Sequence, residues 1–327
     1  MTNDNLLFYE KMNPKIKVNV FGVPIDLGKD GSGSNAAPDY LREQGLMQMF
    51  VDIGFLVEDM GNISVGQRAE LEMGNPKTKF LKEIVRVAQE TARVTFQEVS
   101  AQNKVVAIGG DQCVSFGTIA GASAACKGDL GVIWIDVHAD LMTHENTLSG
   151  NVHGMPASAA MGMGHPDLVN IFQPGAKVAK ENFLFIGLKD MDQDEINLIR
   201  SENLNAITIM DLLQKGFGHI TKAVDELNKR VKNVWICLDL DGIEKNDAPA
   251  TLMGANGSLN YREVTNLAKY IGRKCNVVGM DVSEIVPEMD IDNKTAKLSL
   301  ELISYFLGAD YSWYARYMKK AAEKLKY

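Results

Sequence analysis

The sequence Gly131-Val-Ile-Trp-Ile-Asp-Val-His-Ala-Asp140 passes from an apolar run into three polar side chains at alternate positions. The apolar run, residues 131–135, predicts a buried parallel strand, and the polar residues begin where that strand should end. A fully extended chain would separate Asp136 from Asp140 by roughly 13 Å, so both can serve one site only if the strand breaks into a loop. Two carboxylates and the imidazole of His138 would then suit a divalent metal ion. A helix cap or turn explains the same residues without an ion.

Apolar runs of strand length alternate with helical segments along the chain. This alternation predicts an α/β three-layer sandwich, in which helices cover both faces of a mostly parallel eight-stranded sheet. Ligands of such sheets bind outside the carboxyl ends of the strands, and five predicted strands end in acidic residues. No repeat or linker divides the chain, so we expect one domain over residues 1–327. Strands are expected at 16–23, 55–57, 104–108, 131–135, 182–187, 206–210, 234–238 and 276–280, and helices at 38–49, 75–102, 115–126, from about 156, 220–232, 261–274, 298–307 and 314–327.

The composition excludes several classes of protein. The 327 residues are 46% hydrophobic and carry a net charge of −8, with no basic run dense enough to follow a phosphate backbone, so nucleic acid is not expected as a partner. No apolar stretch approaches the roughly 20 residues of a membrane span. The first ten residues are mostly polar, so no signal peptide is expected. Four cysteines without Cys-x-x-Cys spacing are expected to be reduced, which suggests a cytoplasmic protein.

A second acidic motif repeats the pattern of the first. Asp239-Leu240-Asp241 follows the predicted strand 234–238, and alone it is more often a loop or cap feature than a metal site. Together the two motifs bring four carboxylates and one imidazole to matching strand ends. Carboxylates crowded without cations repel one another, and four exceed what one ion needs, so two ions about 3.5–4 Å apart fit better. Oxygen-rich ligation favours Mn²⁺ or Mg²⁺ over a thiolate-type zinc site.

With these motifs the chain resembles the ureohydrolase superfamily, and arginases in particular. The resemblance extends over most of the chain and keeps the order of the motifs. The matching segments are Gly109-Gly110-Asp111, Asp136-Val137-His138-Ala139-Asp140, Ser149-Gly150-Asn151-Val152-His153-Gly154, Gly187-Leu188-Lys189-Asp190-Met191-Asp192, Asp239-Leu240-Asp241-Gly242, and Glu284 with Pro287 and Asn293-Lys294-Thr295-Ala296.

The resemblance implies a binuclear manganese centre. Asp136 and Asp239 would bridge the two ions, Asp140 would complete one site, and His138 with Asp241 would complete the other. Asp140 is also implied to be catalytic. A metal-bridging hydroxide would attack the guanidinium carbon of the substrate, and urea would leave.

The resemblance also implies how a small cationic guanidino substrate would be held. Glu284 would pair with the guanidinium group, and His153 would shuttle protons at the mouth of the site. Ser149, Asn151 and Asp192 would bind the amino-acid end of the substrate. Arginase-like chains are further expected to form a homo-oligomer, a trimer or a hexamer.

Three positions depart from the family pattern. The first metal motif normally ends in histidine, and here it ends in Gln112, a candidate ligand of the same ion as Asp140. A glutamine oxygen is a poorer ligand for Mn²⁺ than imidazole nitrogen, so this site is expected to be weak or empty. Met142 and the pair Leu252-Met253 replace polar or small residues and make the predicted pocket less polar.

Three functions are therefore compatible with the sequence. The first is hydrolysis of arginine or a close guanidino amino acid, such as hydroxyarginine, to urea and an amine. The second is hydrolysis of a different guanidino or amidino compound, such as an agmatine-like or formimino compound. The third is a catalytically impaired arginase-like protein that binds ligands without turnover. Retention of five ligands together with His153 and Glu284 argues against the third.

Overall fold

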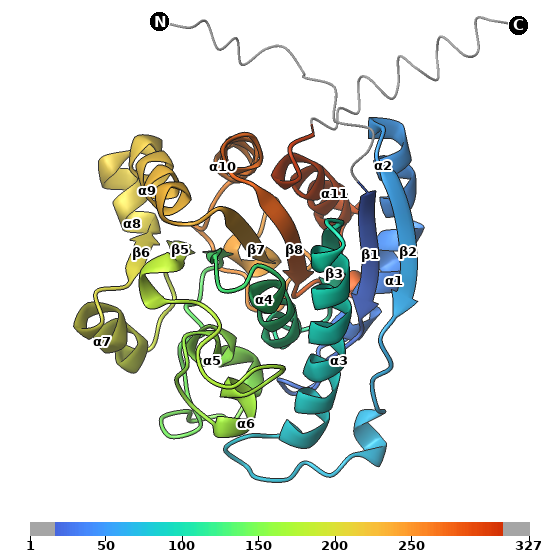
Figure 1. Ribbon diagram of the computed structural model, residues 1–327, viewed down its shortest axis with the longest axis vertical. Helices are drawn as coiled ribbons and strands as arrows, with labels where there is room; N and C mark the ends of the chain where they lie inside the picture. Colours follow the sequence, from blue (N-terminus) through green and yellow to red (C-terminus); the bar gives the residue numbers. More distant parts are fainter. Residues whose placement is uncertain (1–16, 310–327) are drawn as a thin grey trace, which may run out of the picture.

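An eight-stranded sheet forms the centre of the molecule. The computed structural model describes residues 17–309, and every strand pairing in it is parallel, in the order β2-β1-β3-β8-β7-β4-β5-β6 (Figure 1). The α/β fold with a covered eight-stranded sheet is thereby confirmed. The strands are β1 Lys17–Val23, β2 Leu56–Asn62, β3 Lys104–Gly109, β4 Leu130–Ile135, β5 Phe183–Leu188, β6 Asn205–Thr208, β7 Asn233–Asp239 and β8 Val277–Ser283.

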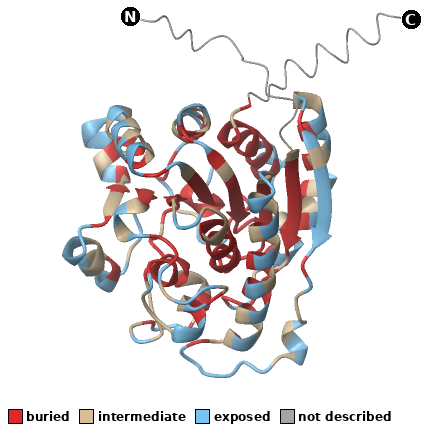
Figure 2. Cartoon of the chain, viewed as in Figure 1, coloured by how far each residue is buried: buried red, intermediate tan, exposed pale blue. Residues whose placement is uncertain are grey.

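Helices cover both faces of the sheet and enclose two apolar cores. One core contains residues of α3 Leu81–Ser100, α4 Val114–Ala125, α5 Pro156–Ala160 and α6 Pro166–Val169. The other contains residues of α1 Ala37–Glu43, α2 Leu46–Ile53, α8 Ile209–Lys215, α9 Phe217–Arg230, α10 Tyr261–Lys274 and α11 Lys294–Phe306. The central strands are buried and β2 is exposed at the edge (Figure 2). No helix within residues 17–309 is long and apolar enough to cross a membrane.

Several predicted boundaries were wrong for local reasons. The predicted helix 38–49 is two helices, because Gly45 takes a left-handed φ of 95° between them. The predicted helix 75–102 begins only at Leu81, after Phe80 in a left-handed conformation. The edge strand expected at 55–57 extends to Asn62, since its exposed face lacks an apolar pattern. Residue 16 and the predicted helix 314–327 lie outside the described residues.

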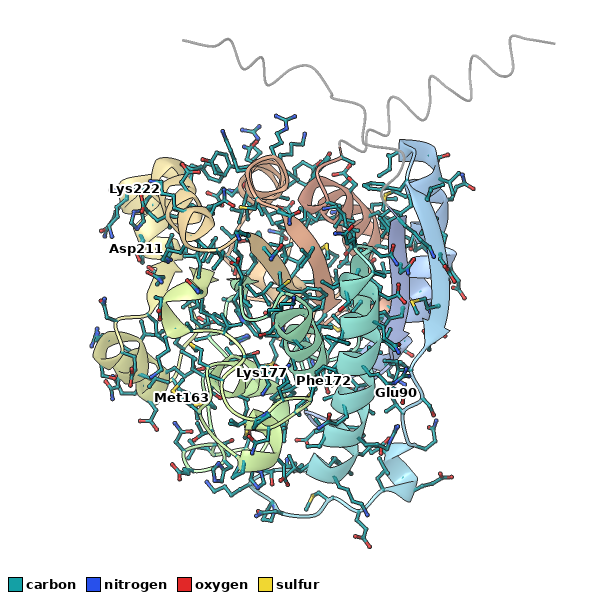
Figure 3. All side chains as sticks on the ribbon, viewed as in Figure 1. Glu90, Met163, Phe172, Lys177, Asp211 and Lys222 are labelled. Carbon is teal, nitrogen blue, oxygen red and sulfur yellow. The ribbon has the colours of Figure 1, made fainter. Side chains whose placement is uncertain are left out.

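Helices α7 and α8 were not predicted, and α8 begins at Ile209, inside the predicted strand 206–210. Helix α7, Gln193–Ser201, is mostly polar, and its sequence signal is a capping box formed by Asp192 and Glu195. The loop before β5 is organised instead by a buried lysine. Lys177 donates hydrogen bonds to the carbonyl oxygens of Val169 and Gly175, both at 2.6 Å. Figure 3 shows Lys177 among the other side chains of the molecule.

The strand order places the sequence motifs side by side. β3, β8, β7 and β4 are consecutive neighbours in the sheet, although β3 and β4 come from the first half of the chain and β7 and β8 from the second. Their carboxyl ends lead into Asp111, Glu284, Asp239 and Asp136 respectively. Because parallel strands end at one edge, the four segments meet there.

Candidate metal centre and active site

A cavity of about 390 Å³ opens at the carboxyl edge of the sheet. Its described lining is strongly acidic and contains no lysine or arginine, so it suits a cation. Three methionines, Met142, Met191 and Met253, also line it, which gives part of the wall an apolar character. The acidic lining residues are Asp140, Asp190, Asp192, Glu195, Asp239 and Asp241, and His138, His153 and Gly154 complete the wall.

Three side chains are grouped as a metal ion requires. Ligand atoms of Asp136, His138 and Asp241 lie within 4.8 Å of one another. His138 Nδ1 is 3.4 Å from Asp136 Oδ1 and 3.5 Å from Asp241 Oδ1. Asp241 Oδ1 is buried and has no hydrogen-bond partner. A buried carboxylate oxygen that accepts no hydrogen bond is costly, and this mixed oxygen and nitrogen donor set fits a divalent cation.

Local turns deliver these ligands. The Asp136 carboxylate accepts a hydrogen bond from the His138 backbone N–H at 2.8 Å, and Asp239 accepts one from the Asp241 N–H, also at 2.8 Å. Asp136 and Asp239 thus bond the local backbone, as the turn interpretation expected, and the second oxygen of Asp239 is left for a metal. Gly242 lets the two turns approach, because a Cβ there would lie 2.7 Å from Asp136 Cα. Trp134 Nε1 fixes the other Asp136 oxygen at 3.0 Å.

Burial and mutual repulsion perturb the carboxylates. Burial, with the charge of Asp241, raises the pKa of Asp136 to about 7. Burial, with neighbouring carboxylates, also raises the pKa values of Asp140 and Asp239 well above their ordinary range. Burial disfavours the charged form of His138, but Asp136 and Asp241 override it and raise its pKa. Such an excess of buried negative charge is the condition that a bound cation relieves.

The side of the site near Gln112 is organised differently. The Gln112 side-chain oxygen accepts a hydrogen bond from the Ser283 hydroxyl, and its amide donates to Ser115 Oγ at 3.0 Å. Ser115 in turn donates to Asp281 Oδ1 at 2.7 Å. Asp140 is buried and lines the cavity with a left-handed φ of 50°. Among the histidine, cysteine and acidic side chains of residues 17–309, the group of three that could hold an ion does not include Asp140. Metal ligation by Asp140 and by Gln112 stays a prediction.

A buried ion pair, which the sequence did not reveal, lies next to Gln112. Lys29 Nζ pairs with Glu284 Oε2, and the side chains are only 6% and 3% exposed. The other oxygen, Glu284 Oε1, accepts the Gln112 backbone N–H at 3.1 Å and lies 3.5 Å from His153 Nδ1. Burial alone would raise the pKa of Glu284, but Lys29 and then His153 lower it to about 2. Only the position of Lys29 just after a strand could have suggested its role.

The residues predicted to bind the amino-acid end of the substrate are spread apart. Asp192 lines the cavity and caps α7. Ser149 and Asn151 are not among the residues that line it. Asn151 Oδ1 accepts a hydrogen bond from Lys79 Nζ at 3.0 Å, and Ser149 Oγ accepts the Asn151 backbone N–H at 3.2 Å. The substrate-binding roles of these three residues stay predictions.

The chain is similar to known proteins over nearly its whole length. The family model described as Arginase matches residues 16–308. The chain is 30% identical to the arginase of Bacillus caldovelox over 293 residues, covering 89% of this chain and 98% of the relative, and 32% identical to that of Brevibacillus brevis over 292 residues, covering 89% and 97%. The solved structure of arginase from Bacillus caldovelox superposes with a TM-score of 0.87 at 30% identity, covering 91% of this chain and all of that one.

Proposed function

Because this chain belongs to the arginase family, whose members hydrolyse C–N bonds of linear amidines, we propose that it hydrolyses arginine or a close guanidino amino acid to urea and an amine, with Mn²⁺ as the metal. The observation that carries the proposal is the cavity at the strand ends. Two members of the metal-ligand group, His138 and Asp241, line the cavity, and its described lining is acidic with no lysine or arginine. A cationic guanidinium group matches that wall in charge.

Asp136, His138 and Asp241 would hold a metal ion, with Asp239 on the same cavity wall. When bound, a divalent ion supplies Lewis acidity, which polarises the substrate and lowers the pKa of water. The protein contributes orientation, because Trp134 and the backbone N–H groups of the two turns fix the carboxylates.

His153 is placed to move protons. Its ring lines the cavity while its Nδ1 lies 3.5 Å from the buried Glu284. Hydrolysis of a guanidino group needs a proton on the departing amine. A half-buried imidazole that joins the cavity to an ionised carboxylate can deliver that proton and recover it from solvent.

A different guanidino or amidino compound is the second candidate substrate. Met142, Met191 and Met253 line the cavity, whereas Ser149 and Asn151 do not. A wall that is acidic and partly apolar offers no lysine or arginine to the carboxylate of an amino acid. It therefore favours a compound without that carboxylate, such as an agmatine-like one.

Product release from a panel of substrates tests the proposal. The full chain, incubated with Mn²⁺, would be assayed for urea from arginine, hydroxyarginine and agmatine, and for formamide from a formimino compound. We expect product release from at least one compound. His138→Ala should lose at least 100-fold in activity, because removing a metal ligand should cost at least as much as removing a residue that orients one. His219→Ala, a matched substitution in α9, should keep full activity. A metal-loaded protein that releases nothing from any compound would leave the binding-protein interpretation in place.

A further inference from the structure

We propose that the ammonium group of Lys29 takes the place of one metal ion, the ion that Asp140 and Gln112 were predicted to bind. Each chain would then bind one divalent ion instead of two. The inference rests on the proposed metal-dependent function, since it assumes that Asp136, His138 and Asp241 hold the remaining ion. It does not depend on which amidine is the substrate.

The position of Lys29 is fixed by the fold. The residue follows β1, which pairs with β3, and β3 pairs with β8. The preceding Gly28 N–H donates to Asp111 Oδ2 at 2.6 Å, and the Lys29 carbonyl accepts a hydrogen bond from Arg68. The side chain therefore leaves a loop that is held at both ends and reaches Glu284 at the end of β8.

The charge around Lys29 is the charge that an ion would otherwise neutralise. Its ammonium pairs with Glu284, and the charges of Glu284, Asp111 and Asp239 overcome the effect of burial and raise its pKa. Asp239 is one of the two carboxylates predicted to bridge the ions. The Lys29 ammonium can neutralise these carboxylates without a metal ion from solution. Its partner Glu284 is also buried, so the two charges form a buried pair.

Gln112 is committed to the protein on the same side. Its oxygen already accepts from Ser283, and its amide donates to Ser115, which donates to Asp281. A metal ion bound by Gln112 would compete with the Ser283 hydroxyl and would repel the nearby ammonium of Lys29. The substitution of the usual histidine and the buried lysine thus act in the same direction.

Glu284 acquires a different role under this proposal. One of its oxygens pairs with Lys29, and the other accepts the Gln112 N–H and faces His153. The carboxylate thus positions Lys29 and His153, and it is not free to neutralise a guanidinium group. The cationic end of a substrate would meet the acidic cavity wall instead.

Metal counting tests the proposal without any substrate. Metal-free full-length protein would be titrated with Mn²⁺ by calorimetry, bound metal counted by mass spectrometry, and the spins examined by electron paramagnetic resonance. We expect one ion per chain and the spectrum of isolated Mn²⁺ in the parent protein. The double variant Lys29→Met/Gln112→His should bind two ions and show the spectrum of a spin-coupled pair.

The single variants make the result unambiguous. Gln112→His keeps the lysine and should remain at one ion. Lys79 pairs with Asp30 and not with Glu284, so Lys79→Met is a matched control and should also bind one ion per chain. Two ions in the parent protein or in Gln112→His, or one ion in a folded double variant, would overturn the role of Lys29. No bound ion in the parent protein would overturn the proposed metal dependence itself.

Discussion

Two of the predicted site residues have a backbone conformation that side chains normally avoid. Asp140 has a φ of 50° and Glu284 a φ of 66°. A left-handed residue other than glycine costs roughly 1–2 kcal/mol, and such strain persists where the surroundings enforce it. The Glu284 N–H donates to Gly110 O at 2.8 Å, and Asp140 O accepts the Ser158 N–H at 3.3 Å. The backbone at both residues is thereby held in place before any ligand arrives.

Gly242 is expected to control metal affinity through space alone. A Cβ added there would lie 2.7 Å from Asp136 Cα, so Gly242→Ala must push the turn after β7 away from that after β4. We expect a 10- to 100-fold loss of Mn²⁺ affinity, which is about the effect of mutating a residue that orients a metal ligand. Calorimetry measures this loss. Gly218→Ala has open space and lies in a helix, so it should leave affinity unchanged. Equal affinities in the two variants would contradict this view of the site.

Asp281 is expected to be a main source of stability behind the site. Its carboxylate accepts hydrogen bonds from Ser115 at 2.7 Å and from Thr118 and Trp235 at 2.6 Å. Asp281→Ala would remove the carboxylate acceptor of these three buried donors and should lower the free energy of unfolding by roughly 3 kcal/mol, measured by urea denaturation. Asp281→Asn keeps one acceptor and should lose less. An alanine variant as stable as the parent would refute this.

At the scale of elements, local signals predicted some boundaries well. Helix α10 was predicted at its observed bounds, Tyr261–Lys274, and in the structure Asn260 and Glu263 form a capping box at its start. Strand β2 was predicted too short, because an edge strand has no second buried face that would impose an apolar pattern on its sequence.

The candidate site was predictable only in part, for a physical reason. Asp136, His138 and Asp241 belong to short motifs that a sequence displays, and the structure groups them. Lys29 and Glu284 are far apart in the chain, and only the β1-β3-β8 order joins them. The packing of Gln112 against Ser283 depends on the same long-range pairing.

Lys104, at the start of β3, gives a prediction about pH. Burial lowers its pKa to about 8, and its Nζ donates to Val277 O at 2.5 Å. Below pH 8 the folded chain carries a poorly solvated charge, so Lys104→Met should raise the free energy of unfolding at pH 7 by about 1 kcal/mol after allowing for screening and the lost hydrogen bond.

The advantage of Lys104→Met should shrink as the pH rises. The folded chain releases the proton near pH 8, whereas the unfolded chain keeps it to about pH 10.4, so the penalty in the parent protein fades over that window. Urea denaturation at pH 7 and 9.5 measures the difference. Lys222→Met, at an exposed position in α9, should show no such trend. An advantage that grows with pH would contradict the expected direction.

At the scale of the whole molecule, metal binding should raise the Tm of the protein. An ion that binds only the folded chain adds about 2.7 kcal/mol at one hundred times its Kd, which corresponds to roughly 4 °C in Tm for a chain of 327 residues. Calorimetry with Mn²⁺ and with a chelator tests this, and His138→Ala should lose the response that His219→Ala keeps. An unchanged Tm in the parent protein would argue against an ion at the strand ends. The trimer or hexamer stays a prediction, which light scattering after gel filtration would test.

The order of the central strands also determines when the site can form during synthesis. β3 pairs with β8 through Val105 and Gly279, and β4 pairs with β7 through Ile133 and Ile236. Until the ribosome has released β7 and β8, the nascent chain presents β3 and β4 with open edges, which are prone to aggregate. Loops this long close slowly. Metal therefore cannot guide early folding, and a chain truncated before β7 would be a substrate for chaperones and proteases.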